Sequence, residues 1–230
     1  MAQRPVFIPS KVRPWVRREM IEFTWHSGFA PSQKQKSIAS LHSAARSELQ
    51  IAKILEISSK SLDSSGIAAS AFNLKLQLPD GTLTTVESAY QGSKRFSSGG
   101  PYTDIYSRSS PEAKRDERVH RTSDRLLAFQ FFSEDWPLEP RSLFYDWLYL
   151  SAMTQPQNKA LLVEVITYRA FTDIEFNPEK SVSCQANSAA LLLGLKQSGH
   201  DLPTITNAKG FRALSSGPDG LSQAGQTRLF

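Results

Sequence analysis

Apolar and polar residues alternate in several short segments of the chain, which is the pattern of a β-strand with one buried face. The clearest segment is residues 71–78, where apolar side chains occupy every second position, and Asp80 and Gly81 after it predict a tight turn. Further short strands are predicted at residues 6–8, 20–25, 53–57, 126–132 and 171–177.

Apolar residues at helical spacing predict several helices between these strands. The serine, proline and glutamate at 110–112 are typical of a helix start, and Gly199 is typical of a helix end. The expected helices are residues 35–49, 84–94, a helix from residue 110, 139–153 and 185–196.

The predicted helix at 139–153 is apolar on nearly all sides, so we expect it to be central in the fold. Asp146 lies within it, and this acid either satisfies a backbone group or lines a pocket. Beyond Asp201 the chain is rich in glycine, serine and proline. This composition predicts one domain over residues 1–200 and a weakly ordered tail over residues 201–230.

The predicted helix at 84–94 carries an unusual set of polar residues. A helix advances about 100° per residue, so Glu87 and Lys94 share a face, and Tyr90 and Gln91 lie between them. A carboxylate, a phenol, an amide and an amine in one column make this helix the best candidate for a site of chemistry.

Simpler interpretations of this helix remain open. Thr84 and Glu87 have the spacing of a capping box, in which the glutamate bonds back to the residue that begins the helix. Lys94 can also be a solvated lysine near a helix C-terminus, where a positive charge interacts favourably with the helix dipole. Gly92 is unfavourable within a helix, so we expect another segment to approach the backbone closely there.

The predicted strand at 171–177 places acidic residues on one side. Ile174 and Phe176 face one way, whereas Asp173, Glu175 and Asn177 face the other. Together with the helix at 84–94 and an aromatic-rich interior, this strand suggests acid–base or amine chemistry on a planar substrate.

Composition limits the classes of protein. At 230 residues, with 40% hydrophobic and 10% aromatic residues, the chain can form one folded domain. Its single cysteine, Cys184, excludes an intrachain disulfide and a cysteine-clustered metal site, and its histidines lack metal-ligand spacing, so we expect no metal or cofactor. No apolar run could span a membrane, and the start of the chain lacks the apolar core of a signal peptide, so we expect a cytoplasmic protein.

A net charge of +5 is compatible with a polyanionic partner. Basic residues next to an aromatic ring suit nucleic acid, although a solvated basic face explains them equally well. One cluster surrounds Trp15 and comprises Arg4, Lys11, Arg13, Arg17 and Arg18; the other comprises Lys114, Arg115, Arg118, Arg121 and Arg125.

Five segments, in order along the chain, resemble a known family. Residues 86–94 resemble the V-E-x-x-Y-Q-x-x-K helix of NADAR (YbiA-like) proteins, and Ser70-Ala-Phe72-Asn73 resembles their S-N-F segment with the asparagine displaced. The other three segments are Ser110 to Lys114, Trp147 to Met153, and Asp173 to Glu175 followed by Asn187. Longer strings, among them residues 21–26, 100–104, 171–178 and 184–186, resemble the NADAR antitoxins associated with DarT-type DNA ADP-ribosyltransferase toxins. The resemblance covers roughly residues 5–200.

This resemblance implies an α+β fold, a single compact helix-rich domain with short strands. It also implies a glycohydrolase that removes ADP-ribose from guanine bases in DNA and thereby reverses the toxin. By motif, Lys94 and Glu87 are the expected catalytic pair. Either the lysine attacks the anomeric carbon and forms a Schiff base, or its cation stabilises charge while Glu87 activates a water.

The resemblance also implies roles for residues around this pair. Asp173 or Glu175 would orient the lysine or the ribose hydroxyls. Residues expected to hold ADP-ribose are Phe72, Asn73, Tyr90, Gln91, Trp147 and Asn187. The displaced asparagine sets Asn73 apart from the family pattern, and Trp147 also fits a core position.

Two other functions remain open. The chain could be a non-catalytic antitoxin that blocks the toxin or masks modified DNA, or an N-glycosidase of small nucleotides. A blocking protein has no need of the Lys94 and Glu87 pair, and a free-nucleotide hydrolase has little use for two basic clusters. The sequence leaves direct contact with the toxin, the strandedness of the DNA and the oligomeric state open.

Overall fold

The alternating residues at the N-terminus form two eight-residue strands in a computed structural model of the protein, which describes residues 1–28, 30–120, 124–179 and 181–215. Strands β1 (Ala2–Pro9) and β2 (Val16–Phe23) pair along their full length, and a four-stranded sheet follows the order β2-β1-β9-β3. β9 (Ala170–Thr172) is antiparallel to β1, whereas β3 (Ile54–Glu56) is parallel to β9. The main sheet therefore joins the N-terminal hairpin to two strands from later in the chain.

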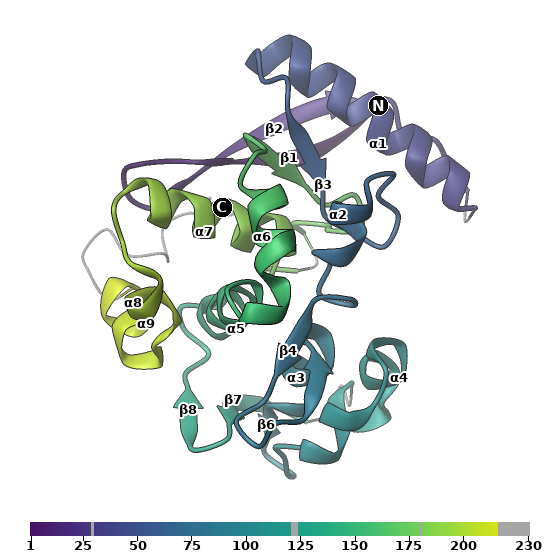
Figure 1. Ribbon diagram of the computed structural model, residues 1–230. Coiled ribbons are helices and arrows are strands. Elements are labelled where there is room, and N and C mark those ends of the chain that lie inside the picture. Colours follow the sequence, from purple (N-terminus) through teal and green to yellow (C-terminus); the bar gives the residue numbers. More distant parts are fainter. Residues whose placement is uncertain (29, 121–123, 180, 216–230) are drawn as a thin grey trace, which may run out of the picture.

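Helices cover both faces of this sheet (Figure 1). Helix α1 (Pro31–Leu49) packs Ile38 and Leu41 against the apolar side chains of β1 and β2. Helix α7 (Gln185–Gln197) contacts β1 and β9, and its apolar residues are buried. The sheet is thus the middle layer of an α+β domain.

Helix α5 (Leu143–Met153) is central, as its apolar pattern predicts. It contacts α7, α3 (Val86–Gly92) and the hairpin strand β4 (Lys75–Gln77). It begins at Leu143 rather than at Glu139. Asp146 is buried in it and accepts a hydrogen bond of 2.6 Å from the Ser188 hydroxyl of α7. The partner of this acid is therefore a side chain of the neighbouring helix and not a backbone group.

Below α5 in Figure 1, short elements build the part of the fold that carries the candidate site. Strands β4 and β5 form a hairpin, and β6, β7 and β8 form a three-stranded antiparallel sheet. These elements are β4 (Lys75–Gln77), β5 (Leu83–Thr85), α3 (Val86–Gly92), β6 (Lys94–Phe96), η1 (Thr103–Ser107), α4 (Ser110–Arg115), η2 (Glu117–Val119), β7 (Leu126–Phe131) and β8 (Glu134–Trp136).

The remaining helices pack around α5. The prediction of a weakly ordered tail is wrong for residues 202–215, because Ile205 and Phe211 are fully buried there; residues 216–230 lie outside the described part of the chain. These helices are α2 (Ser64–Ala68), η3 (Pro156–Asn158), α6 (Lys159–Val165), α8 (Leu202–Thr206) and α9 (Ala208–Ser215).

Two strands are shorter than their alternation predicts. Of residues 71–78 only β4 is a strand, because Asn73 and Leu74 donate backbone hydrogen bonds to the Ser70 carbonyl and close a turn. Of residues 171–177 only the start belongs to β9, and Phe176 then donates to the Asp173 carbonyl. In both segments local backbone hydrogen bonds replace the sheet ladder.

The close approach expected at Gly92 is present. A methyl group there would lie 2.6 Å from the Tyr106 ring and 3.0 Å from the Tyr102 carbonyl oxygen. We expect Gly92→Ala to destabilise the protein by about 1–3 kcal/mol, because overpacking a rigid contact forces neighbouring groups apart. The melting temperature should fall by about 2–4 °C per kcal/mol. Ser47→Ala, at an exposed position of α1, is the control, and an unchanged melting temperature for Gly92→Ala would contradict the contact.

Candidate functional site

Helix α3 begins one residue later than the capping-box spacing predicts. Thr85 is the cap residue, and its hydroxyl accepts a hydrogen bond of 3.2 Å from the Ser88 amide. The capping role predicted for Glu87 is therefore wrong. Its buried carboxylate instead accepts a hydrogen bond of 2.9 Å from the Gln91 side chain.

Lys94 does not lie on this helix. Helix α3 ends at Gly92, and Lys94 is the first residue of β6, paired with Phe129 of β7. The helical face shared by Glu87 and Lys94 is thus a wrong prediction. The side chains nevertheless belong to one site, because Lys94 Nζ lies 5.5 Å from the centroid of the Tyr90 ring and the Glu87 charge acts on the lysine.

The environment of Lys94 favours a free amine. Burial is the main cause that lowers the pKa of Lys94 to about 8, and the positive charge of Lys114 lowers it further. The Glu87 carboxylate opposes both by favouring the ammonium form. The net effect is a lysine that loses its proton at a lower pH than an exposed one.

Aromatic rings form one wall of the site. Tyr90 packs on Phe129 with ring centroids 5.1 Å apart, on Phe144 at 6.1 Å and edge-to-face on Tyr145 at 5.2 Å. Burial raises the pKa of Tyr90 to about 12 and that of Tyr145 well above its usual range, so both phenols stay protonated near neutral pH. Tyr145 was missed by sequence reasoning, which took its helix as core.

The side chain of Gln91 is held by the Glu87 carboxylate. Its side-chain nitrogen donates to Glu87, whereas its side-chain oxygen is buried and has no hydrogen-bond partner among the described residues. An amide oxygen left unpaired in this position can accept a hydrogen bond from a ligand hydroxyl.

Phe72 and Asn73 lie on the turn that precedes β4, and the structure separates their roles. Phe72 is half-buried, and its carbonyl accepts a hydrogen bond of 2.7 Å from Ser110. Asn73 is exposed, and its side-chain nitrogen donates to Ile67 and Ser70 at 3.0 Å each. Asn73 therefore holds its own turn, which leaves Phe72 as the ring available to a ligand.

Trp147 lies in the core. It is 9% exposed, it packs on Trp136 with ring centroids 4.6 Å apart, and its indole nitrogen donates a hydrogen bond of 2.8 Å to the Thr206 carbonyl. These contacts support the packing interpretation of Trp147 over a substrate-binding one. Asn187 is half-buried and its side chain hydrogen-bonds to Asp146.

The two acids after β9 have different environments. Asp173 is buried, and burial followed by the charge of Glu56 raises its pKa to about 8. Glu175 is exposed and pairs with Lys34 of α1 at 3.3 Å. The expectation that both acids face one way is therefore wrong.

Gln185 connects Asp173 to the site, and sequence reasoning assigned it no role. Its nitrogen donates to Asp173 at 3.0 Å, and its side-chain oxygen accepts from the Ala71 amide at 2.7 Å. The Ala71 carbonyl in turn accepts the Glu87 amide at 2.9 Å. Asp173 is thus placed to orient the turn and helix that carry Phe72 and Glu87. The string Cys184-Gln-Ala was the available signal.

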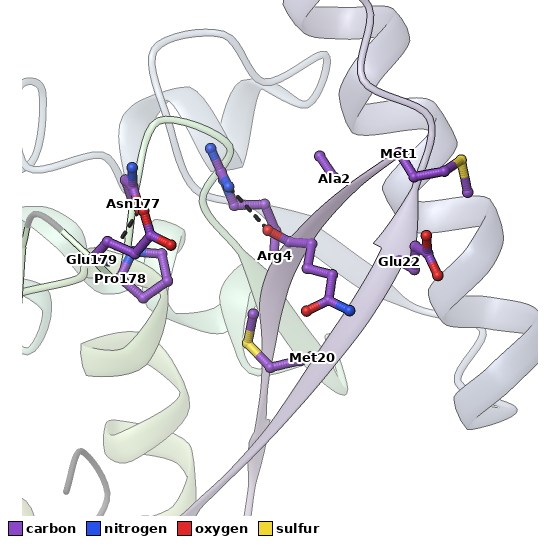
Figure 2. Close-up of a pocket in the computed structure, with 9 residues that line it drawn as sticks. Met1, Ala2, Arg4, Met20, Glu22, Asn177, Pro178 and Glu179 are labelled. Atoms are coloured by element: carbon purple, nitrogen blue, oxygen red, sulfur yellow. Dashed lines mark hydrogen bonds between the residues drawn. The ribbon is translucent and has the colours of Figure 1, made fainter. Parts of the chain in front are cut away.

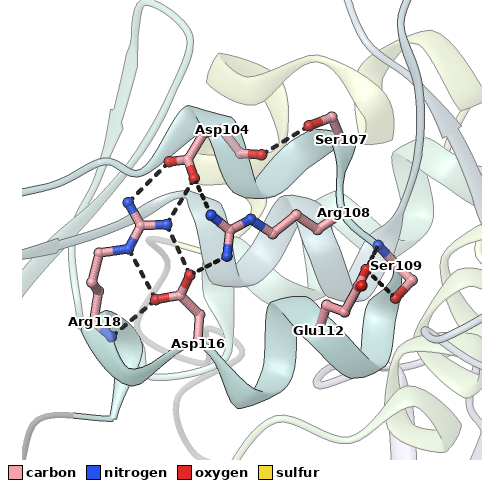
Figure 3. A network of polar contacts seen from close by, with 7 residues as sticks. All are labelled: Asp104, Ser107, Arg108, Ser109, Glu112, Asp116 and Arg118. Carbon is pink, nitrogen blue, oxygen red and sulfur yellow. Dashed lines mark hydrogen bonds and ion pairs between the residues drawn. The ribbon is translucent and has the colours of Figure 1, made fainter.

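The basic clusters are largely occupied within the protein. Trp15 is 3% exposed, so its ring is too buried to stack on a base, and the Arg13 guanidinium lies 4.7 Å from its centroid. Arg118 contacts both Asp104 and Asp116 at 2.8 Å (Figure 3). Arg121 lies outside the described residues. The clusters therefore offer fewer cations to DNA than the sequence suggests.

A pocket of about 410 Å³ lies at the outer end of β1 and β2 (Figure 2). None of the predicted site residues lines it, and its polar groups are those of Arg4, Glu22 and Glu179 among others. Within residues 1–28, 30–120, 124–179 and 181–215, no group of three or more histidine, cysteine or acidic residues could hold a metal ion, and no helix could cross a membrane. Burial raises the pKa of Cys184 well above its usual range, which opposes a thiolate nucleophile.

The fold and site define an α+β domain in which a partly buried lysine, a buried glutamate and a wall of aromatic rings meet. The chain belongs to the family of DarT1-associated NADAR antitoxins, whose family model matches residues 2–221. The resemblance seen in the motifs is thereby confirmed. The family description associates the protein functionally with a DarT1 toxin. A search of curated proteins found no match.

Proposed function

We propose that this antitoxin is a glycohydrolase that removes ADP-ribose from guanine bases in DNA and so reverses the modification made by its DarT-type toxin. The observation that carries the proposal is the Lys94 amine, which burial keeps partly uncharged beside the Glu87 carboxylate. A protein that only blocks a toxin gains nothing from desolvating a lysine, because burying a cation costs free energy.

The first step uses the lysine as a nucleophile. The uncharged Nζ of Lys94 bonds to the anomeric carbon while the bond from that carbon to guanine breaks, and Glu87 takes one of the two amine protons. Glu87 delivers its proton to the departing guanine nitrogen. The ribose ring opens, its oxygen gains the remaining amine proton, and the lysine is left as a Schiff base.

The second step releases the sugar. Water adds to the Schiff base, the carbon–nitrogen bond breaks, and ADP-ribose leaves as the aldehyde, which restores the Lys94 amine. The half-buried Phe72 ring can contact a flat group of the substrate, and the unpaired oxygen of Gln91 can accept from a ribose hydroxyl. A base linked to ADP-ribose must leave the DNA stack to reach Lys94.

The test is ADP-ribose release from a guanine-ADP-ribosylated DNA oligonucleotide by the intact protein, measured by chromatography. Multiple turnovers are the expected result. Binding of the oligonucleotide without release would instead support a masking module, and release from the free modified nucleotide alone would support a small-nucleotide N-glycosidase. Competition by unmodified DNA that weakens with salt would support the DNA substrate.

The pH dependence of this release separates the two roles of Lys94. A nucleophilic amine must be uncharged, so the rate should rise about tenfold per pH unit below the lysine pKa and level off above pH ~8. A lysine that acts as a cation would give the opposite pH dependence, in which the rate falls as the pH rises through 8. The measurement is kcat/KM between pH 6 and 10, with thermal melts at each pH as the control for unfolding.

A further inference from the structure

Lys114 is an exposed cation held over an aromatic ring at the site. Its Nζ lies 5.0 Å from the centroid of the Phe72 ring, and it forms no ion pair with any residue in the described part of the chain. Its charge acts on Lys94, whose pKa it lowers. Two lysines therefore interact with one another here, and the buried Glu87 carboxylate interacts with Lys94 as well.

The surrounding structure fixes the helix that carries Lys114. The start of α4 is closed by Ser109, whose amide and hydroxyl donate to Glu112 at 3.0 and 2.6 Å (Figure 3). The Ser110 hydroxyl bonds to the Phe72 carbonyl at 2.7 Å and also lies 2.7 Å from the Thr85 hydroxyl at the start of α3. Helix α4 is therefore tied both to the turn that carries Phe72 and to the helix that carries Glu87.

Two arginines that flank α4 in the sequence, Arg108 and Arg118, are neutralised internally. Arg108 contacts Asp104 and Asp116 at 2.7 Å each, and Arg118 contacts the same two acids (Figure 3). These pairs hold the pKa of Asp116 at about 2, so the cluster stays ionised at neutral pH. Lys114 takes no part in these ion pairs, and its ammonium lies over the Phe72 ring instead.

We propose that Lys114 and Phe72 form an anion subsite beside Lys94, which binds the diphosphate of the ADP-ribosyl group. The inference rests on the proposed function, because a ribose whose anomeric carbon meets Lys94 carries its diphosphate a few bonds away. A flexible ammonium is a good phosphate ligand, and the Phe72 ring orients it. Phosphates of the DNA backbone are the other source of this chemistry.

The experiment compares Lys114→Gln with Arg115→Gln, which removes the neighbouring exposed cation of α4. Binding of ADP-ribose, inorganic pyrophosphate and an unmodified oligonucleotide is measured by calorimetry. We expect Lys114→Gln to weaken ADP-ribose and pyrophosphate about tenfold or more and Arg115→Gln to change them less than twofold. Equal small effects of both variants would overturn the proposal, as would a loss confined to the oligonucleotide, which would assign Lys114 to the DNA backbone.

A second readout needs no turnover. The pH dependence of Lys94 acetylation by acetic anhydride, followed by peptide mass spectrometry, reports the protonation of its amine. Removing the charge of Lys114 should shift this profile to higher pH, because a like charge no longer opposes the ammonium form. An unchanged profile would contradict the interaction between the two lysines and overturn the proposal. If the intact protein releases no ADP-ribose while both readouts depend on Lys114, the proposed function fails and the anion subsite stands.

Discussion

Lys94→Ala should reduce ADP-ribose release from a modified oligonucleotide by about 10³-fold or more, because the reaction loses its nucleophile. The variant should fold as well as the unchanged protein. The amine is partly buried at a cost in free energy, and its neighbours Tyr90 and Phe129 keep their own packing. Single-turnover rates and thermal melts measure the two effects.

Lys75→Ala is the matched control for this variant, since Lys75 is an exposed lysine of the nearby strand β4. It should release ADP-ribose at the unchanged rate. Cells should be protected against the toxin by the unchanged protein and by Lys75→Ala, but not by Lys94→Ala. A Lys94→Ala protein that is folded and still releases ADP-ribose at full rate would remove the lysine from the mechanism.

Glu87→Gln should lower the rate by about 10²–10⁴-fold, because the proton that passes from the lysine to guanine loses its carrier. The substitution keeps the shape of the side chain and an oxygen that can accept the hydrogen bond from Gln91. The loss should persist at every pH. The kcat/KM of the variant across the pH range measures this loss. The charge control is Glu117→Gln, at an exposed glutamate of η2.

A purely electrostatic role for Glu87 predicts a different outcome. The Glu87 carboxylate raises the pKa of Lys94, so its removal leaves more uncharged amine at pH 7. If Glu87 only held the lysine, Glu87→Gln would be as active as the unchanged protein, or more active, at neutral pH. That result would contradict the proton relay while leaving the nucleophile in place.

The sequence placed Glu87 and Lys94 near one another, but through the wrong local structure. Glu87 and Lys94 were paired through helical periodicity, yet α3 ends at Gly92 and β6 begins at Lys94. A strand that pairs with β7 brings the lysine back beside Tyr90, and such non-local pairing leaves no periodic signal in the sequence. The close approach at Gly92, read from the cost of glycine in a helix, was confirmed.

Residues that depend on tertiary contacts escaped prediction. Tyr145 lies in a continuously apolar helix, where no pattern separates a wall of the site from the core. The link from Asp173 through Gln185 to Ala71 joins segments more than 100 residues apart, so it follows from the fold alone. For Trp15 the sequence suggested a role that the structure does not support. Its basic neighbours suggested a nucleic-acid surface, but its burial excludes base stacking.

The central claim is that the Lys94 amine bonds to the anomeric carbon of the substrate. Sodium borohydride added during turnover of the modified oligonucleotide reduces a Schiff base to a stable amine, and mass spectrometry of the digest locates it. The account predicts an ADP-ribose adduct on the Lys94 peptide that forms only with substrate and is missing in Lys94→Ala. Full-rate release in borohydride with no adduct on Lys94 would contradict it and favour a water activated by Glu87.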